Sequence, residues 1–275
     1  MAVESITETA MIWGTVSGAS MAGMVISLLL SVGLPIFLCI FIYKKTRAWV
    51  PAFFIGCGIF VGFAMILEQI CHAIVLMLTG SVLQDNIWLY GLYGGVAAAL
   101  FEETGRWIAM KFCLKRHLTR ENALMYGAGH GGIEAFLILG MSSMSNLLTA
   151  AMINGGLMEK TMTALEPAQQ EVTYNQLSIL WTTPAYQFYL APLERISAIA
   201  LQIALSILVY SAVKTGRKLH LAAAFGLHFA VDFLTVICAS MIPTWVLELG
   251  LLVVVAVICA AVYKLVYVHP AEKKA

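Results

Sequence analysis

Seven stretches of the chain are each long and apolar enough to cross a lipid bilayer, and this repetition restricts the possible folds more than any other feature. A spanning helix needs roughly 20 predominantly apolar residues. Lipid offers no hydrogen-bond partners to the backbone, so such stretches form helices. The sequence therefore predicts an all-α polytopic bundle of seven spans, in a single integral membrane domain covering residues 1–275. The stretches lie near 20–43, 50–79, 87–112, 122–144, 186–213, 219–241 and 245–268.

The composition agrees with a membrane protein and excludes one class of partner. Hydrophobic residues make up 61% of the chain and charged residues only 11%, whereas soluble domains carry about a quarter charged residues. A formal net charge of +1 argues against nucleic acid as a partner, and we expect the lipid bilayer instead. The six cysteines form no CxxC pair and lie in apolar segments, which is typical of small buried residues.

Loop charges predict the orientation. Of the 16 Lys and Arg residues, 13 lie in connections that follow alternate spans, near 43–47, 111–120 and 214–218, or close to the C-terminus. By the positive-inside rule the N-terminus is outside and the C-terminus cytosolic.

The first ten residues lack the positive charge of a signal peptide, so we expect the first apolar helix to remain in the mature protein. Residues 175–190 leave open an eighth, re-entrant or interfacial element.

Few ionisable residues remain inside the spans, and most occur in pairs. A charge near the bilayer centre costs about 2.5–3.5 kcal/mol on insertion scales, so such residues usually mark a site or an ion pair. At about 1.5 Å per residue, three helices place their charged residues in one layer, roughly 12–20 Å from the cytosolic ends. The layer contains Glu102, Glu103 and Arg106, then His130 and Glu134, and then His228 and Asp232.

Spacing along each helix places these residues on shared faces. Arg106 follows Glu102 by four positions and Glu103 by three, so its guanidinium can reach either carboxylate. The two histidines each precede a carboxylate by four positions, which also puts each pair on one helix face. Outside this layer, Glu68 and Arg195 lie nearer the outer face, and their depth predicts a structural ion pair between the second and fifth spans.

The layer contains the side chains that hydrolysis needs. Two imidazoles and several carboxylates can hold a divalent metal, for which zinc is the first candidate. Zinc lowers the pKa of a bound water towards neutrality. One glutamate of the adjacent pair then serves as general base, while Arg106 keeps the other ionised or stabilises negative charge on the substrate. A metal-free mechanism, in which a glutamate and a histidine activate water directly, stays open.

Other classes of intramembrane protease and other functions are less consistent with the sequence. There is no HExxH motif, Asp232 is the only aspartate within a span, and the serines of residues 140–146 lack a GxSxG setting. A transporter that uses the charges as a proton or ion relay is one alternative, although no inverted repeat supports it. A non-catalytic membrane scaffold is another.

The glycines around His130 have two interpretations. Gly127 and Gly131 form a GxxxG spacing, which lets two helices approach closely. The bare backbone beside His130 would also leave room for an extended substrate. We expect the packing role to account for at least part of the pattern.

Three motifs carry a resemblance to a known family. "FEETGR" (101–106), "GHGGIEAF" (129–136) and "LHFAVDF" (227–233) resemble the EExxR, HxxxE and HxxxD signatures of the YhfC family of bacterial intramembrane metalloproteases. That family is similar to the PrsW proteases and, more distantly, to the CAAX-prenyl endopeptidase and bacteriocin-processing superfamily. The resemblance covers the core from about 90 to 235.

The resemblance implies a multi-pass hydrolase of the bacterial plasma membrane, with a catalytic core at about 87–241 and a membrane-associated peptide or protein as substrate. It implies catalytic roles for Glu102, Glu103 and Arg106. The candidate metal ligands are His130, Glu134, His228 and Asp232. PrsW-type proteins usually have Lys at the Arg106 position, and the prenyl endopeptidases use EExxxR and end their last motif in Asn. These departures leave the type of substrate open.

Overall fold

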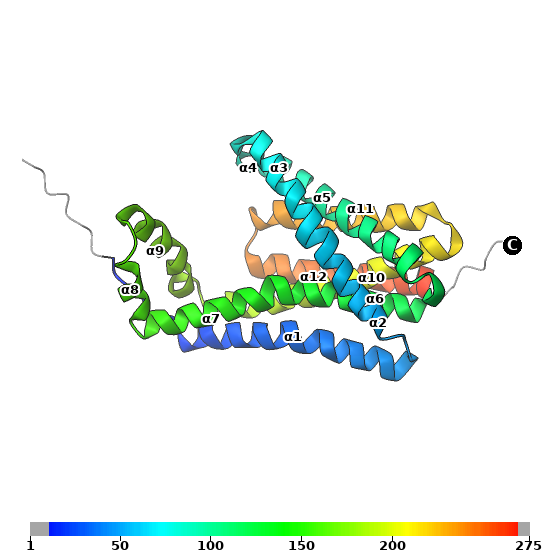
Figure 1. The fold of residues 1–275 in the computed structure, drawn as a ribbon, viewed down its shortest axis with the longest axis horizontal. Helices are drawn as coiled ribbons and strands as arrows, with labels where there is room; N and C mark the ends of the chain where they lie inside the picture. Colours follow the sequence, from blue (N-terminus) through cyan, green and yellow to red (C-terminus); the bar gives the residue numbers. More distant parts are fainter. Residues whose placement is uncertain (1–10, 269–275) are drawn as a thin grey trace, which may run out of the picture.

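The computed structural model describes residues 11–268, and within that range every regular element is helical (Figure 1). This confirms the predicted all-α polytopic bundle. The acidic start of the chain and the C-terminal lysines, which contribute to the predicted orientation, lie outside the described residues. The elements are α1 (Gly18–Thr46), α2 (Pro51–Phe60), η1 (Val61–Glu68), α3 (Gln69–Thr79), α4 (Ser81–Asp85), α5 (Ile87–Ile108), η2 (Ala109–Cys113), η3 (Lys115–His117), α6 (Arg120–Ala135), η4 (Phe136–Gly140), α7 (Met141–Asn154), α8 (Leu157–Met162), α9 (Pro167–Thr182), α10 (Gln187–Thr215), α11 (Lys218–Ala239), α12 (Thr244–Val262) and η5 (Tyr263–Tyr267).

Six continuous helices of the described range are long and apolar enough to cross a membrane. The remaining predicted span is α5 with its π-helical continuation η2. Its apolar character is reduced by the buried charges of Glu102, Glu103 and Arg106. The six are Gly18–Thr46, Pro51–Thr79, Arg120–Asn154, Gln187–Thr215, Lys218–Ala239 and Thr244–Tyr267.

Helix α10 is the central element of the bundle. Two thirds of its apolar stretch (67%) is buried, compared with 17–22% in the other five apolar helices. Helices α1, α6, α11 and α12 pack around it, while α2 packs on α6 and α5 packs on α11. Any polar side chain on the inward faces of α10 is therefore held away from lipid and must find its partners within the bundle.

Glycines allow two close helix crossings next to His130. A Cβ atom on Gly129 would lie 1.9 Å from the backbone oxygen of Phe53, and one on Gly56 would lie 2.2 Å from the oxygen of Tyr126. Helices α2 and α6 thus touch backbone to backbone. Gly127 and Gly131 face α10 instead. A Cβ atom on Gly127 would lie 2.7 Å from a Cα atom of that helix, and one on Gly131 would lie 3.0 Å from another. The expected packing role of the GxxxG spacing is confirmed.

The second interpretation of these glycines is wrong. Beside His130, Gly127 and Gly131 are covered by α10, Gly129 by α2, and Gly132 by Pro35 of α1. No open space for a substrate lies over any of these four positions. Their missing side chains bring neighbouring backbones together.

The long connection after α7 forms two further helices, α8 and α9, at the left-hand end of the molecule in Figure 1. Leu177, Leu180 and Trp181 of α9 pack with residues from the beginning of α1 and the end of α7. The residues singled out at 175–190 contain the end of α9, a short non-helical break at 183–186 and the first residues of α10. Helix α9 is not among the six helices that are apolar enough to span a membrane.

The basic connections of the described range gather at the opposite end. The ends of α1, η2, α10 and η5, and the beginnings of α6 and α11, meet at the right-hand side of Figure 1. Thr119 begins α6 there by accepting a hydrogen bond from the backbone N–H of Asn122, which is a favourable helix start. The grouping of Lys and Arg at this end is what the predicted N-outside orientation requires.

Candidate functional site

Helix α5 carries three charged side chains that are buried together. Glu103 and Arg106 are completely buried and Glu102 nearly so. The Nε atom of Arg106 lies 3.3 Å from Oε2 of Glu103, and its terminal nitrogen 4.0 Å from Oε2 of Glu102. As the spacing predicts, the guanidinium is within reach of both carboxylates, with Glu103 the closer.

Arg106 is anchored more firmly to α10 than to its own helix. One terminal nitrogen donates to the backbone oxygen of Gln202 (2.6 Å) and to the hydroxyl of Ser206 (2.9 Å), and the other donates to the side-chain oxygen of Gln202. Hydrogen bonds from a charged donor are stronger than neutral ones. The guanidinium therefore ties α5 to the central helix and keeps Glu103 paired.

Helix α6 supplies His130, which is completely buried. Its Nε2 atom lies 2.9 Å from Oε2 of Glu102. The rings of Phe60 and Tyr126 are 5.2 and 5.9 Å away between centroids, and the Nδ1 atom has no hydrogen-bond partner among the described residues. One edge of the imidazole therefore faces Glu102 while the other is enclosed by aromatic side chains.

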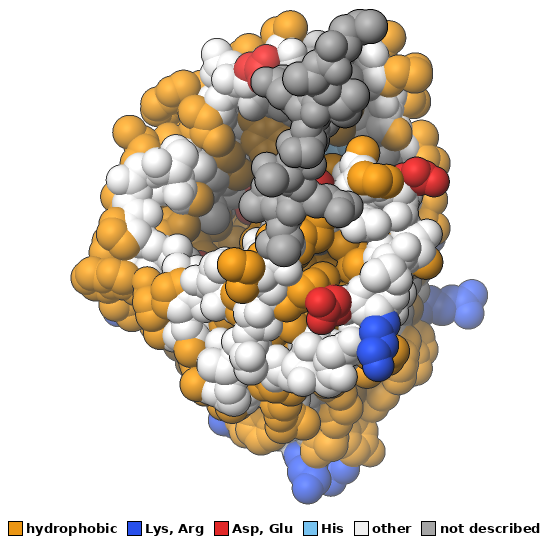
Figure 2. All heavy atoms as spheres, turned by 90° about the vertical axis from the view of Figure 1, so that its left-hand side faces the viewer, with side chains coloured by type: hydrophobic (Ala, Val, Ile, Leu, Met, Phe, Trp, Pro, Cys, Tyr) orange, Lys and Arg blue, Asp and Glu red, His pale blue; other side chains and the backbone are white. Residues whose placement is uncertain are grey.

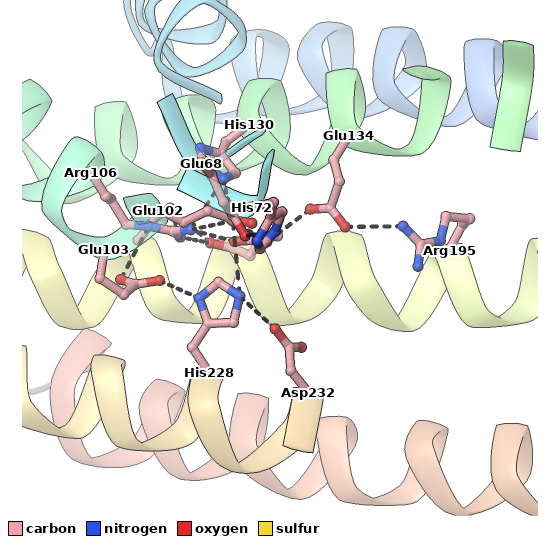
Figure 3. Close-up of polar contacts among 12 residues, drawn as sticks. Glu68, His72, Glu102, Glu103, Arg106, His130, Glu134, Arg195, His228 and Asp232 are labelled. Carbon is pink, nitrogen blue, oxygen red and sulfur yellow. Dashed lines mark hydrogen bonds and ion pairs between the residues drawn. The ribbon is translucent and has the colours of Figure 1, made fainter. Parts of the chain in front are cut away.

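Glu134 lies one turn further along α6 and is bound on both carboxylate oxygens. Its Oε1 accepts a hydrogen bond from Arg195 at 3.0 Å, and its Oε2 accepts one from the amide of Gln202 at 2.8 Å. Arg195 also pairs with its neighbour Glu194. These bonds fix the carboxylate of Glu134 between α6 and α10, as Figure 3 shows for the Arg195 side.

Helix α11 supplies His228, whose two ring nitrogens face different carboxylates (Figure 3). The Nδ1–H group donates to Glu103 at 2.8 Å. The Nε2 atom lies 3.4 Å from Asp232 and 3.9 Å from Glu102. An imidazole oriented by a carboxylate on one nitrogen and free to bind on the other is the usual arrangement of a histidine metal ligand.

The candidate residues therefore form one connected cluster, although they come from three helices far apart in sequence. One ligand atom each of Glu102, His130 and Glu134 lies within 4.8 Å of the other two. His228 adjoins this group through its contact to Glu102, and Asp232 adjoins His228. Nitrogen and carboxylate oxygen donors at this separation are suited to a divalent metal ion.

A cavity of about 480 Å³ reaches the cluster. Glu102, Glu134, His228 and Asp232 line it, whereas Glu103, Arg106 and His130 do not. Its outer part is formed by residues from α3, from the first turns of α5 and from the beginning of α10. Figure 2 views this end of the molecule, where the surface is hollowed between helices and carries scattered acidic side chains.

The predicted ion pair between Glu68 and Arg195 is wrong. Glu68 pairs with His72 on its own helix at 3.2 Å, and the other nitrogen of His72 lies 2.8 Å from the hydroxyl of Tyr93 on α5. Arg195 pairs with Glu134 and Glu194. Depth alone could not distinguish these partners, because side chains at the same depth can project from their helices in different directions.

Sequence reasoning missed the role of Gln202, which contacts Arg106, Glu102 and Glu134. A signal for it exists. Gln202 is an isolated amide in the apolar run of α10, seven positions after Arg195 and four before Ser206. That spacing places all three on one helix face. The sequence therefore indicates a polar face on the fifth span.

Comparison with known proteins identifies the family. Residues 30–259 match the family described as YhfC intramembrane metalloprotease. The chain is 42% identical over 204 residues to the uncharacterized membrane protein YhfC of Bacillus subtilis (strain 168), a match that covers 71% of this chain and 76% of the relative. No solved structure matches. The apolar helices of this chain and its relationship to YhfC indicate a multi-pass bacterial membrane protein. The chain belongs to the YhfC intramembrane metalloprotease family.

Proposed function

We propose that this protein is a peptidase that cleaves a membrane-associated peptide or protein within the bilayer, with Glu102 as the residue that activates water. The observation that carries the proposal is the place of the Glu102 carboxylate. It lines the cavity and lies in the same 4.8 Å group as His130 and Glu134. A base that lines a cavity can accept a proton from water that enters with the substrate.

The residues present fit a divalent metal. His130 and Glu134 converge with Glu102, and His228 directs Nε2 towards the same carboxylate while Glu103 holds its other nitrogen. His130, Glu134 and His228 would hold the ion, with Asp232 beside His228. A zinc ion bound there supplies a water molecule of lowered pKa and polarises a carbonyl group. The family description supports the metal-dependent form over direct activation by glutamate and histidine.

The side chains of this site have separate roles in the proposed peptide hydrolysis. Glu102 takes a proton from the attacking water as its oxygen bonds to the peptide carbonyl carbon, and the same carboxyl group then protonates the departing amine nitrogen. Glu103, which does not line the cavity, orients His228. Arg106 stays paired with Glu103 and holds that carboxylate in place.

The cavity supports a polypeptide segment as substrate. Its wall combines the aromatic rings of Tyr90 and Tyr93 with aliphatic side chains of α11 and α12, such as Val236 and Val255. A volume of about 480 Å³ accommodates a few residues of an extended chain rather than a whole helix. The segment to be cut would therefore unwind locally before it reaches Glu102.

Membrane proteomics tests this proposal. Cells that carry the wild-type protein are compared with cells that carry Glu102→Gln or Glu248→Gln. Glu248 is also a buried intramembrane glutamate, but it does not line the cavity. We expect an uncut membrane polypeptide to accumulate in the Glu102→Gln cells only. An identical set of fragments in all three strains, at equal protein levels, would contradict the proposed activity.

A further inference from the structure

The side-chain amide of Gln202 lies between the two carboxylates of the candidate metal group. Its Nε2 atom donates to Oε2 of Glu102 at 2.9 Å and to Oε2 of Glu134 at 2.8 Å. The residue is buried, with 4% of its surface exposed. Both amide hydrogens are thus used, one on each carboxylate.

The neighbours of Gln202 determine which way its amide points. Arg106 offers only donors, and the side-chain oxygen of Gln202 accepts from it. The Oε2 atoms of Glu102 and Glu134 lie on the other side and accept the amide hydrogens. Reversing the amide would bring donor against donor and acceptor against acceptor, so one orientation is strongly preferred.

We propose that Gln202, which binds Glu134 and the neighbouring Glu102, competes with the divalent metal for the proposed ligand Glu134 and thereby sets the metal affinity of the site. This inference rests on the metal-dependent function proposed above. A zinc ion approaches a carboxylate oxygen to about 2.0–2.2 Å, so an amide hydrogen and a metal cannot use the same side of the same oxygen. A metal that takes the side of Glu134 Oε2 to which Gln202 now donates must therefore displace that N–H group.

Arg106 makes this competition reversible. The amide oxygen of Gln202 and its backbone oxygen are both held by the guanidinium, so a displaced amide keeps an anchor on α5. Ser206 occupies the adjacent guanidinium hydrogen. Gln202 is therefore a positioning residue, which holds the two carboxylates together when no metal does so and yields them when one binds.

The competition predicts that metal affinity rises when the amide is removed. Two hydrogen bonds to charged groups are lost in Gln202→Leu, and each such bond is typically worth enough to change an equilibrium about tenfold or more. If Gln202 competes with the metal, these bonds must be broken when the metal binds. We therefore expect Gln202→Leu to bind Zn²⁺ at least about tenfold more tightly than wild type.

The test measures Zn²⁺ binding to purified full-length protein in lipid nanodiscs, by competition with a chromogenic chelator. Gln187→Leu is the matched control, since it makes the same substitution on α10 outside the cluster and the cavity. Gln202→Met, which keeps the length of the side chain without its donors, serves if the leucine variant does not fold. The rise in unfolding temperature caused by Zn²⁺ is recorded for each protein and should be largest in the Gln202 variants.

The outcomes separate this inference from the proposed function. Tighter binding in the Gln202 variants with unchanged binding in Gln187→Leu supports the competition. Equal or weaker binding in the Gln202 variants overturns it, because Gln202 is then a bystander or a ligand. If wild type and all variants bind no Zn²⁺, Mn²⁺ or Co²⁺, the metal-dependent function itself is wrong, and the competition with it.

Discussion

The Nδ1 atom of His228 lies 2.8 Å from the carboxylate of Glu103, although the two residues are 125 positions apart in the chain. This bond connects α11 to α5 and leaves Nε2 of the histidine directed towards Glu102. The two adjacent glutamates thereby acquire different surroundings. Glu102 faces the cavity, whereas Glu103 is enclosed between His228 and Arg106.

Replacing Glu102 by Gln should abolish cleavage without unfolding the protein. The amide keeps the volume of the side chain and a hydrogen-bonding oxygen but cannot accept a proton, and loss of a general base typically costs about 10²–10⁴-fold in rate. Cleavage of the accumulated polypeptide by purified protein measures the rate, and thermal unfolding checks the fold. Retention of more than about a tenth of the wild-type rate would show that another group activates the water.

Replacing Glu103 by Gln should weaken metal binding more than it lowers the unfolding temperature. His228 loses its carboxylate partner, and loss of such an outer carboxylate typically reduces metal affinity by about 10–100-fold. The Zn²⁺ dissociation constant and the metal-free unfolding temperature should be measured on the same preparation. If affinity is unchanged while the unfolding temperature falls, Glu103 serves only to neutralise Arg106.

Purified protein should retain about one divalent metal ion per chain, and His130 and His228 should be needed for it. His220 provides the control on α11, because it lies at the basic end of that helix and contacts Ser211 rather than the cluster. Elemental analysis of His130→Ala, His228→Ala and His220→Ala is the measurement. A fully active wild-type preparation that contains no metal and resists chelators would instead favour direct activation of water by Glu102.

Double-mutant cycles should assign the partner of Arg195. The pair of Arg195 with Glu134 is partly buried, so Arg195→Met alone should lower stability, by less than the about 3–5 kcal/mol typical of breaking a fully buried ion pair. Combined with Glu134→Gln the effects should be less than additive, because both changes break one contact. Combined with Glu68→Gln they should add within about 0.5 kcal/mol. Strong coupling to Glu68 would contradict the observed pairing.

Gly129→Ala should disturb the position of His130 by pushing α2 and α6 apart. Its Cβ would lie 1.9 Å from the backbone oxygen of Phe53, which cannot rotate away. Overpacking of this kind typically costs about 1–3 kcal/mol or more. Gly58→Ala on α2 is the matched control, since its Cβ meets nothing within 4 Å. We expect lower thermal stability and weaker Zn²⁺ binding in Gly129→Ala only; equal behaviour of the two variants would refute the backbone contact.

Much of the candidate cluster was predictable because helix geometry converts sequence spacing into depth and direction. The apolar lengths determined which segments form helices, since lipid leaves the backbone no other partners. Counting residues from the loops put Glu102, His130 and His228 at one depth, where the structure brings them into contact. The rise per residue is constant along a helix, so depth needs no knowledge of neighbouring helices.

Lateral partners were decided only by the tertiary structure. The sequence placed Glu68 and Arg195 at similar depth, yet Glu68 pairs with His72 on its own helix, whereas Arg195 pairs with Glu134 on α6. The glycines next to His130 were visible in the sequence, but only the assembled bundle shows that α2 and α10 cover them.

The sequence by itself therefore determined the long apolar helices and the shared depth of the charged residues. Which carboxylate faces the cavity, which one holds His228, and the insertion of the Gln202 amide between Glu102 and Glu134 were decided by the tertiary structure. The physical reason is that hydrogen bonds and ion pairs depend on distances of about 3 Å between side chains. Such distances are set by the rotation and close packing of neighbouring helices, which are properties of the assembled bundle and not of any one segment.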